Sequence, residues 1–241
     1  VSMPHPFRGV HYLGGGSHTP SQKVASACFC HPKTAWSSKM NTFIILVCGI
    51  NIRAHNRITL ADQLRLLQTC PELMSINHAG DKGSYLVTTK NDASRTVEAV
   101  LCVLRKQCST ISGAAIYQPS EVQSALKALT DLLSDRFAQY FDKDDFGLKI
   151  EGEKWRAGLA VPLYPMKLPQ VVLPFHKTKN AMIFGVTDGA VLVAKREARN
   201  VHWGTSVTDP SERQIKRISN CSVTLTSRSA NIMNVLLAHS R

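Results

Sequence analysis

Residues 43–47 read Phe-Ile-Ile-Leu-Val, and Gly49 follows them almost at once. A short apolar run that ends near a glycine is typical of a buried β-strand. The next regular pattern lies over residues 60–67, where leucines recur at helical spacing behind Thr59, a good N-cap residue. A strand followed by a helix that ends near Pro71 is therefore the first prediction, and the rest of the chain is interpreted outward from it.

The residues up to 117 continue this alternation. A hairpin is predicted over residues 73–89, with the turn at Gly80-Asp81-Lys82-Gly83. A second helix, capped by Asp92 or Ser94, and a strand at 114–117 complete the set. The order β, α, β, β, α, β matches the ferredoxin-like motif, in which both helices cover one face of an antiparallel sheet.

The sequence pattern of the remaining residues predicts a second α+β module. Its signals are a long bridging helix, an Asp-Gly hairpin turn and an amphipathic terminal helix. Prolines interrupt residues 162–174, and we assign no element there. The expected elements are a helix capped by Ser120, strands at 181–186 and 190–194, a helix capped by Asp209 with Pro210 in its first turn, a strand at 223–225 and a helix at 231–238.

These elements define the predicted architecture. The fold class is α+β, with two ferredoxin-like (α/β-plait) subdomains that have antiparallel sheets. The similar order of elements in the two subdomains suggests a distant structural repeat. The first subdomain, with the bridging helix, covers residues 41–145, and the second covers residues 146–241. Residues 1–40 are rich in Pro, Gly, Ser and His and lack any period, so they are predicted to be a disordered extension before a natural start at Met40.

Two motifs in this extension are interpreted without a function. Gly14-Gly15-Gly16 lacks the flanking strand and helix of a phosphate loop. The cluster at residues 28–31, Cys-Phe-Cys-His, supplies three potential zinc ligands where four are needed, so free thiols are expected. We predict no metal site.

Composition limits the protein class. With 241 residues, 44% hydrophobic and 19% charged, the chain is neither collagenous nor wholly disordered. The longest apolar run, Phe43 to Ile50, has eight residues, whereas a membrane-spanning helix needs about 20. Seven scattered cysteines in a chain of this size indicate reduced thiols rather than a secreted disulfide framework, and we expect a cytoplasmic protein.

The net charge of +12 and the pI near 9.6 indicate a surface that attracts anions. Residues 1–40 contribute +4 of this charge and contain no acid, which leaves +8 for residues 41–241. Part of the basic character therefore belongs to the extension.

Two short motifs carry a resemblance to a known family. The first runs from Leu46 to Ile58, Leu-Val-Cys-Gly-Ile-Asn-Ile-Arg-Ala-His-Asn-Arg-Ile, and the second runs from Val223 to Asn231, Val-Thr-Leu-Thr-Ser-Arg-Ser-Ala-Asn. They resemble the opening and closing signatures of the uncharacterised bacterial family called domain of unknown function 1697, L-L-R-G-I-N-V-G-G-K-N and V-T-x-T-x-R-N-W-N. The matching positions are Gly49, Ile50, Asn51, Asn56, Thr226, Arg228 and Asn231.

The resemblance implies two α/β-plait subdomains and no settled activity. This chain also departs from the family pattern. Cys48 stands in place of an arginine, Arg53-Ala54 in place of two glycines, His55 in place of a lysine, and Ala230 in place of a tryptophan. These changes remove a cation, backbone freedom and an aromatic platform, so we expect a divergent member.

The turn after the first strand is the candidate ligand site. A strand end followed by Gly49, Asn51 and Asn56 exposes N–H groups and amides that can hold an anion or a base edge. The alternative is structural, because glycine and asparagine also shape turns through their own backbone. We predict a ligand set of Gly49, Asn51, Arg53, Asn56, Arg228 and Asn231, in which Arg228 meets the turn on the condition that the modules pack together.

Cations near an aromatic ring supply a candidate nucleic-acid surface, because phosphates need positive charge and bases stack on aromatic faces. The residues are Lys195, Arg196, Arg199, Trp203, Arg213, Lys216 and Arg217. Exposed cations that serve only solubility are the alternative.

No nucleophile elbow, Walker loop or H-E-x-x-H helix occurs, so no catalytic residue and no cofactor are predicted. The function predicted from the sequence is binding of a small anionic ligand or nucleic acid through the turn at Gly49 to Asn56. The alternatives are an enzyme that acts on a phosphorylated or otherwise anionic metabolite, and a scaffold or degenerate copy without a ligand.

Overall fold

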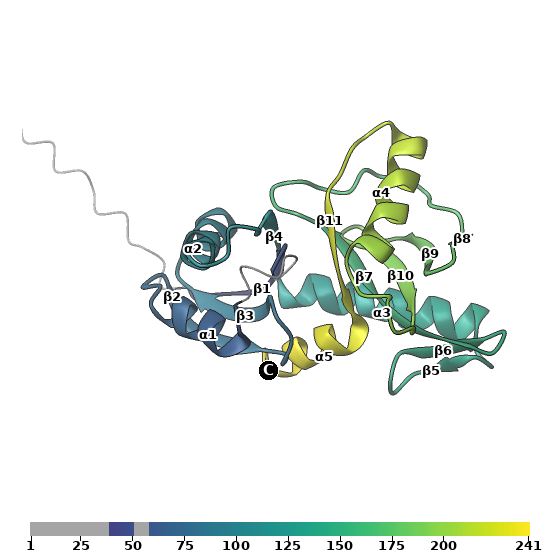
Figure 1. Cartoon of the computed structure of the whole chain (residues 1–241), viewed down its shortest axis with the longest axis horizontal. Helices are drawn as coiled ribbons and strands as arrows, with labels where there is room; N and C mark the ends of the chain where they lie inside the picture. The colour runs from purple at the N-terminus through teal and green to yellow at the C-terminus, as the bar shows by residue number, and fades with distance from the viewer. Residues whose placement is uncertain (1–38, 51–57) are drawn as a thin grey trace, which may run out of the picture. The chain divides into compact units, whose positions relative to one another are not determined.

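The computed structural model describes residues 39–50 and 58–241, which contain helices and two antiparallel sheets (Figure 1). The predicted α+β class with antiparallel sheets is confirmed. The predictions of a disordered extension and of free thiols at Cys28 and Cys30 concern residues outside the described part. No helix in the described part is long and apolar enough to cross a membrane.

The first sheet is built from four strands, β1 (Asn41–Cys48), β2 (Leu73–His78), β3 (Ser84–Thr89) and β4 (Gly113–Tyr117). Their order across the sheet is β2-β3-β1-β4, and every neighbouring pair is antiparallel. The predicted hairpin between β2 and β3 is confirmed. β1 lies inside the sheet, which explains why its sequence is apolar without alternation.

Two helices, α1 (Leu60–Gln68) and α2 (Ala93–Arg105), cover one face of this sheet. Thr59 and Asp92 cap them as predicted, because their side chains accept hydrogen bonds from the N–H groups of Asp62 and Arg95 at 3.1 and 2.9 Å. The buried helix residues pack on the odd-numbered side chains of β1, which are Phe43, Ile45 and Val47.

The second sheet follows the order β5-β6-β7-β10-β9-β8, and β11 also pairs with β7. Its long strand β7 was not predicted from the sequence, where residues 153–162 received no element. The bounds are β5 (Phe141–Asp142), β6 (Gly147–Ile150), β7 (Glu153–Pro162), β8 (His176–Lys177), β9 (Ala181–Val186), β10 (Val191–Arg196) and β11 (Leu225–Ser229). The predicted hairpin around Asp188-Gly189 is confirmed by the pairing of β9 with β10.

Helices α3 (Pro119–Arg136) and α5 (Ala230–Ala238) contribute to a core that both sheets share. This core joins Ile44 and Leu46 of β1 to alternate residues of β7, such as Leu159. The opposite face of the second sheet packs against α4 (Thr205–Ser219). The two sheets are therefore connected by buried apolar side chains. The predicted boundary between subdomains at residue 145 stays a prediction.

Two predicted N-caps, Ser120 and Asp209, are wrong. α3 begins at Pro119 with Gln118 as its N-cap, because the Glu121 carboxylate accepts a hydrogen bond from the Gln118 N–H at 2.7 Å. α4 begins at Thr205, so Pro210 lies inside the helix rather than in its first turn. A tertiary contact supports the early start of α4, since the Gly204 N–H donates to Ser227 Oγ at 3.0 Å.

The strands of the two sheets follow the same relative order. β9-β10-β7-β11 repeats β2-β3-β1-β4, with β7 in the place of β1. α4 joins β10 to β11 as α2 joins β3 to β4. Where the first half has α1, the second half has residues 163–175, which contain no helix or strand and which we call the strap. Prolines 165, 169 and 174 explain why this connection is not helical.

Candidate functional site

Gly49 follows β1 and has a φ of +91°, a backbone conformation that favours glycine. A Cβ at this position would overlap the carbonyl oxygen of Thr110, whose hydroxyl donates to the Gly49 carbonyl at 2.7 Å. Backbone packing alone thus requires the glycine. Asn51, Arg53 and Asn56 lie outside the described residues, so ligand binding by the turn stays a prediction.

Arg228 extends from β11 to the end of β1 and the turn between β2 and β3. Its Nε donates to Ser84 Oγ at 2.7 Å, and its Nη2 donates to the carbonyl oxygens of Val47 at 2.8 Å and Gly83 at 3.3 Å. Its Nη1 donates to Ser227 O and to Thr226 Oγ1. Each of the three guanidinium nitrogens therefore has a partner within the protein.

The charge of Arg228 is compensated by one carboxylate. Asp81 Oδ2 lies 3.3 Å from Arg228 Nε and also accepts a hydrogen bond from Ser84 Oγ at 2.6 Å. Burial lowers the pKa of Arg228, and Asp81 opposes this effect. The arginine stays protonated, because its ordinary pKa lies far above neutral pH. The structure thus places this predicted ligand residue in a largely buried link between the sheets.

Asn231, the other predicted ligand residue of the second module, lies at the start of α5. Its Nδ2 donates to Asp145 Oδ1 at 2.8 Å. Asp145 also accepts two hydrogen bonds from Arg156, whose Nε donates to Glu197 at 2.7 Å. The network joins α5 to the loop before β6 and to β7. Binding of a ligand by Asn231 stays a prediction.

Replacing Asp145 with asparagine should lower the thermal unfolding midpoint by about 2–4 °C near pH 7, as for the loss of a favourable ion pair. Hydrogen bonds from Arg156 and then Asn231 hold the pKa of Asp145 below its ordinary value. A lowered folded-state pKa gives stability above the unfolded-state pKa, and this stability is lost as the pH falls through the folded-state pKa. The difference between wild type and variant should therefore disappear between about pH 5 and pH 2.

Thermal unfolding followed by circular dichroism across this pH range measures the effect. Asp135→Asn is the matched control, because Asp135 is an exposed carboxylate on α3. A difference for Asp145→Asn that persists at pH 2 would contradict the linkage.

Three of the predicted nucleic-acid residues make internal contacts. Lys195 Nζ donates to the Val201 carbonyl at 3.0 Å, and burial lowers the pKa of this lysine. Arg196 pairs with Glu153 at 2.7 Å. The Trp203 ring packs over Gly158, where an added Cβ would lie 2.5 Å from Trp203 Cη2. These side chains are positioned by the second sheet.

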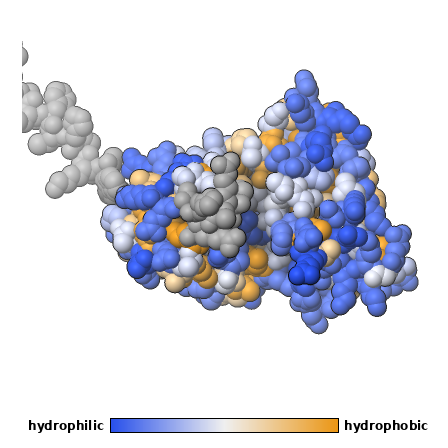
Figure 2. Space-filling model, viewed as in Figure 1, coloured by the Kyte–Doolittle hydropathy of each residue, from blue (hydrophilic) through white to orange (hydrophobic). Residues whose placement is uncertain are grey.

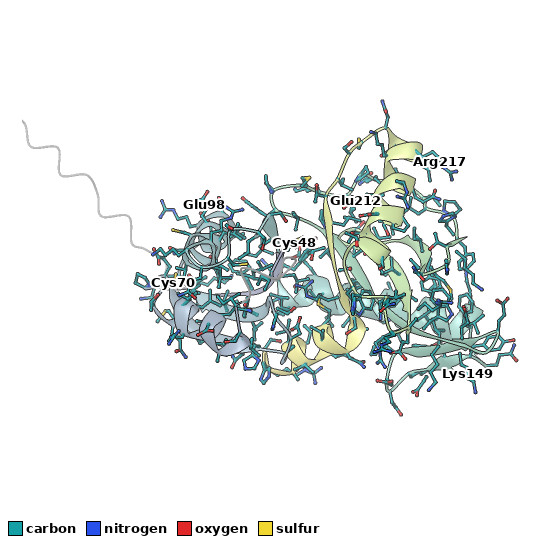
Figure 3. The ribbon with its side chains drawn as sticks, viewed as in Figure 1. Cys48, Cys70, Glu98, Lys149, Glu212 and Arg217 are labelled. Atoms are coloured by element: carbon teal, nitrogen blue, oxygen red, sulfur yellow. The ribbon has the colours of Figure 1, made fainter. Side chains whose placement is uncertain are left out.

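The other four predicted residues, Arg199, Arg213, Lys216 and Arg217, are exposed. The last three lie on α4, where Arg217 is marked in Figure 3. The surface over α4 is predominantly hydrophilic in Figure 2. The structure therefore divides the predicted set into an internal group and an exposed group, and binding of nucleic acid stays a prediction.

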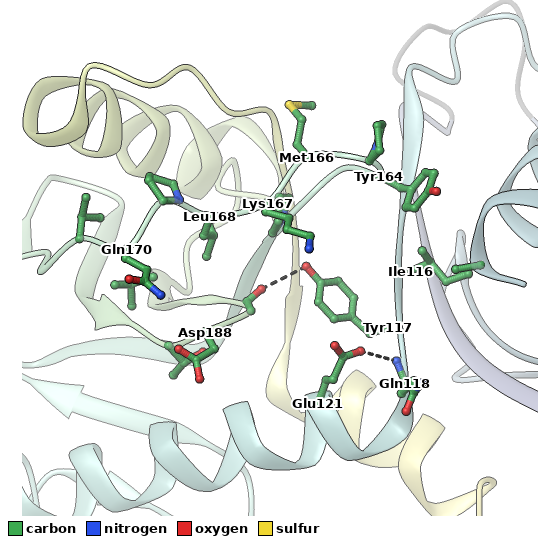
Figure 4. Close-up of a pocket in the computed structure, with 18 of the residues that line it drawn as sticks. Ile116, Tyr117, Gln118, Glu121, Tyr164, Met166, Lys167, Leu168, Gln170 and Asp188 are labelled. Carbon is green, nitrogen blue, oxygen red and sulfur yellow. Dashed lines mark hydrogen bonds between the residues drawn. The ribbon is translucent and has the colours of Figure 1, made fainter.

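A groove of about 900 Å³ opens between β4, the start of α3, the strap and the β9–β10 hairpin (Figure 4). None of its residues belongs to the predicted ligand or nucleic-acid sets. Its lining is divided almost evenly between polar and apolar surface, and the apolar side chains are those of Phe43, Ile116, Met166, Leu168, Val171, Val172 and Val186. Val172 is 88% exposed, so the strap offers apolar surface that no described part of the protein covers.

A few polar groups converge on this groove. Tyr117 donates from its hydroxyl to the Gly189 carbonyl at 3.1 Å, and burial raises the pKa of Tyr117 so that the phenol stays protonated. In Figure 4, Lys167 extends from the strap toward Tyr117, while Glu121 and Asp188 lie on other walls. The groove thus combines apolar walls with one ammonium group and two carboxylates.

A second cavity of about 290 Å³ shares Tyr117, Glu121 and Gly189 with the groove and reaches toward Leu159 and Val161 of β7. The hydrogen bond from Tyr117 to Gly189 therefore lies at the boundary between the groove and the second cavity. Apolar residues between prolines and an Asp-Gly turn were visible in the sequence. That these residues line one groove depends on where the strap lies, and the strap has no hydrophobic periodicity from which its position could be predicted.

Comparisons with known proteins bear on the fold alone. No family model and no curated protein sequence matches the chain. A solved structure of a conserved bacterial protein from Streptococcus pneumoniae is similar, with a TM-score of 0.52 and 14% sequence identity. The match covers 84% of this chain and 100% of that one. The resemblance to domain of unknown function 1697 stays a prediction.

Proposed function

We propose that this protein binds an organic ligand in the groove between β4, α3, the strap and the β9–β10 hairpin. The observation that carries the proposal is a cavity of about 900 Å³ in which apolar side chains and several polar groups line the same space. Ligand pockets in proteins have volumes of about 300–1,000 Å³. The exposed apolar side chains of the strap add support, because such surface is costly unless a ligand covers it.

The test is a thermal-shift screen with metabolites of different charge and with short oligonucleotides as separate arms. A groove ligand at about 100 times its Kd should stabilise the fold by about 2.7 kcal/mol, which corresponds to about 5–10 °C for a chain of this size. Gln170→Trp should abolish the shift, because residue 170 is exposed and lines the groove.

Gln123→Trp is the matched control, since Gln123 is exposed on α3 and does not line the groove. This variant should respond like the wild type. A shift that survives Gln170→Trp would place the ligand elsewhere, and the absence of any shift from the whole screen would contradict the proposal. Stabilisation by oligonucleotides that disappears with added salt would instead support the nucleic-acid function predicted from the sequence.

We also propose that the two halves are ferredoxin-like subdomains of common descent. The equal strand orders support this, as do the matching positions of α2 and α4. In this interpretation the strap replaces the first helix of the second subdomain. A groove next to the strap is then a consequence of the replacement, because an extended connection covers less of a sheet face than a helix does.

A further inference from the structure

We infer that the groove takes an extended peptide segment of a partner protein that carries a basic side chain and pairs with the free edge of β4. This inference rests on the proposed function, because it names the ligand of the same groove. Strand addition to an exposed sheet edge is a common mode of peptide recognition, in which main-chain hydrogen bonds supply affinity and pockets for side chains supply specificity.

The edge of β4 is available at Ile116. β4 is the last strand of its sheet, and the Tyr164 N–H donates to the Ala114 carbonyl at 2.9 Å from outside the sheet. The polar groups of Ala114 therefore point away from β1. In an antiparallel pair the main-chain groups of alternate residues point the same way, so those of Ile116 also point outward.

Ile116 lines the groove, and among the described residues no partner across this edge bonds its main-chain groups. The strap thus occupies the edge at Ala114 and leaves it before Ile116. An extended peptide in the groove continues the row of bonds that Tyr164 begins. It gains two main-chain hydrogen bonds at Ile116, and its alternate side chains face the apolar walls.

The size and character of the walls fit an extended chain. The groove is open along the strap, where Tyr164 and Met166 are 39% and 38% exposed. Large apolar side chains exposed together are typical of interaction surfaces. Residues two apart on a peptide strand point to the same face, so every second peptide side chain can contact the strap.

Charge decides the preferred peptide. Glu121 and Asp188 give the groove two exposed carboxylates, against the one ammonium group of Lys167. One oxygen of Glu121 accepts a hydrogen bond from the Gln118 N–H, and Asp188 makes no hydrogen bond or ion pair with another described residue. A basic peptide side chain is therefore favoured over an acidic one, and arginine can pair with a carboxylate through several donors.

The experiment uses the full chain and a fluorescein-labelled peptide, Val-Thr-Val-Arg-Val-Thr with an amidated end. Fluorescence anisotropy should show binding to the wild type. A peptide with glutamate in place of arginine should bind at least tenfold more weakly. Methylation of alternate peptide nitrogens should have a similar effect, because a methylated nitrogen cannot donate to the strand edge.

The double variant Glu121→Gln, Asp188→Asn should bind the arginine peptide about tenfold more weakly and lose the preference over glutamate. The glutamine keeps an oxygen for the Gln118 N–H, so the helix cap survives. Asp135→Asn, on the same helix away from the groove, should bind like the wild type.

Equal binding of methylated and unmethylated peptides would overturn strand addition, and equal binding of the glutamate peptide would overturn the charge preference. If the arginine peptide does not bind while a metabolite gives a shift that Gln170→Trp abolishes, the peptide inference fails and the proposed function stands. Failure of both experiments would overturn both.

Discussion

Replacing Arg228 with alanine is expected to lower the free energy of unfolding by about 3 kcal/mol, at the lower end of the cost of removing one partner from a buried ion pair, because this pair is partly exposed. The side chain is only 13% exposed and joins β11 to β1 and to the β2–β3 turn. Without the guanidinium, the Asp81 carboxylate loses its ion-pair partner while its side chain is only 22% exposed to water. The hydrogen bond from Ser84 Oγ remains. The carbonyl oxygens of Val47 and Gly83 also lose a donor.

Urea unfolding followed by tryptophan fluorescence measures this loss. Arg228→Lys should recover only part of the stability, because an ammonium group lacks the planar set of five donors that reaches several acceptors at once. Arg213→Ala removes an exposed arginine from α4 and should change the stability by no more than about 0.5 kcal/mol. A loss below about 1 kcal/mol for Arg228→Ala would show that the guanidinium does not hold the sheets together.

Gly158→Ala should lower the free energy of unfolding by about 3 kcal/mol or more, at the upper end of the cost of overpacking a core. Gly158 lies in β7 opposite Ser229 of β11. An added Cβ would overlap the carbonyl oxygen of Arg228, and it would lie 3.0 Å from the Cα of Ser229. Both atoms belong to a paired backbone, which cannot rotate away as a side chain can.

The control for this substitution is Gly147→Ala in β6. Its Cβ would meet Asp142 Cβ at 3.8 Å, an ordinary van der Waals contact, and its φ is not in the left-handed region. We expect little change in its urea midpoint. If the two alanine variants were equally stable, the close approach of β7 and β11 would not require a glycine.

Local sequence patterns predicted the elements whose stabilising contacts are also local. The predicted caps of α1 and α2 are confirmed. The side chains of Thr59 and Asp92 each accept a hydrogen bond from the backbone N–H group three residues later. The Asp188-Gly189 turn lies between two short apolar runs, and the hairpin is confirmed as well. In each case the deciding residues are neighbours in the chain.

The missed elements depend on distant partners. β7 is buried along most of its length and pairs on both sides, so its residues show neither alternation nor helical spacing. The start of α4 depends on Ser227, 23 residues from Gly204. Proline at position 210 favoured a later start, but the helix includes it.

The candidate sites also include some that the sequence indicated and one that it did not. The sequence drew attention to Gly49 and Arg228, and the structure places Gly49 against Thr110 and Arg228 against β1. The groove was not predicted, because its walls come from β1, β4, α3, the strap and a hairpin. Ile116 and Asp188 are 72 residues apart and carry no common motif.

The sequence by itself determined the α+β class, the antiparallel hairpins, the caps of α1 and α2 and the basic charge, because backbone propensity, side-chain period and charge are local properties. Only the tertiary structure decided that Arg228 is enclosed between the sheets and that the strap leaves the edge of β4 open at Ile116. The burial of a side chain and the meeting of groove walls both require several segments to pack together. They therefore depend on contacts between residues far apart in the chain.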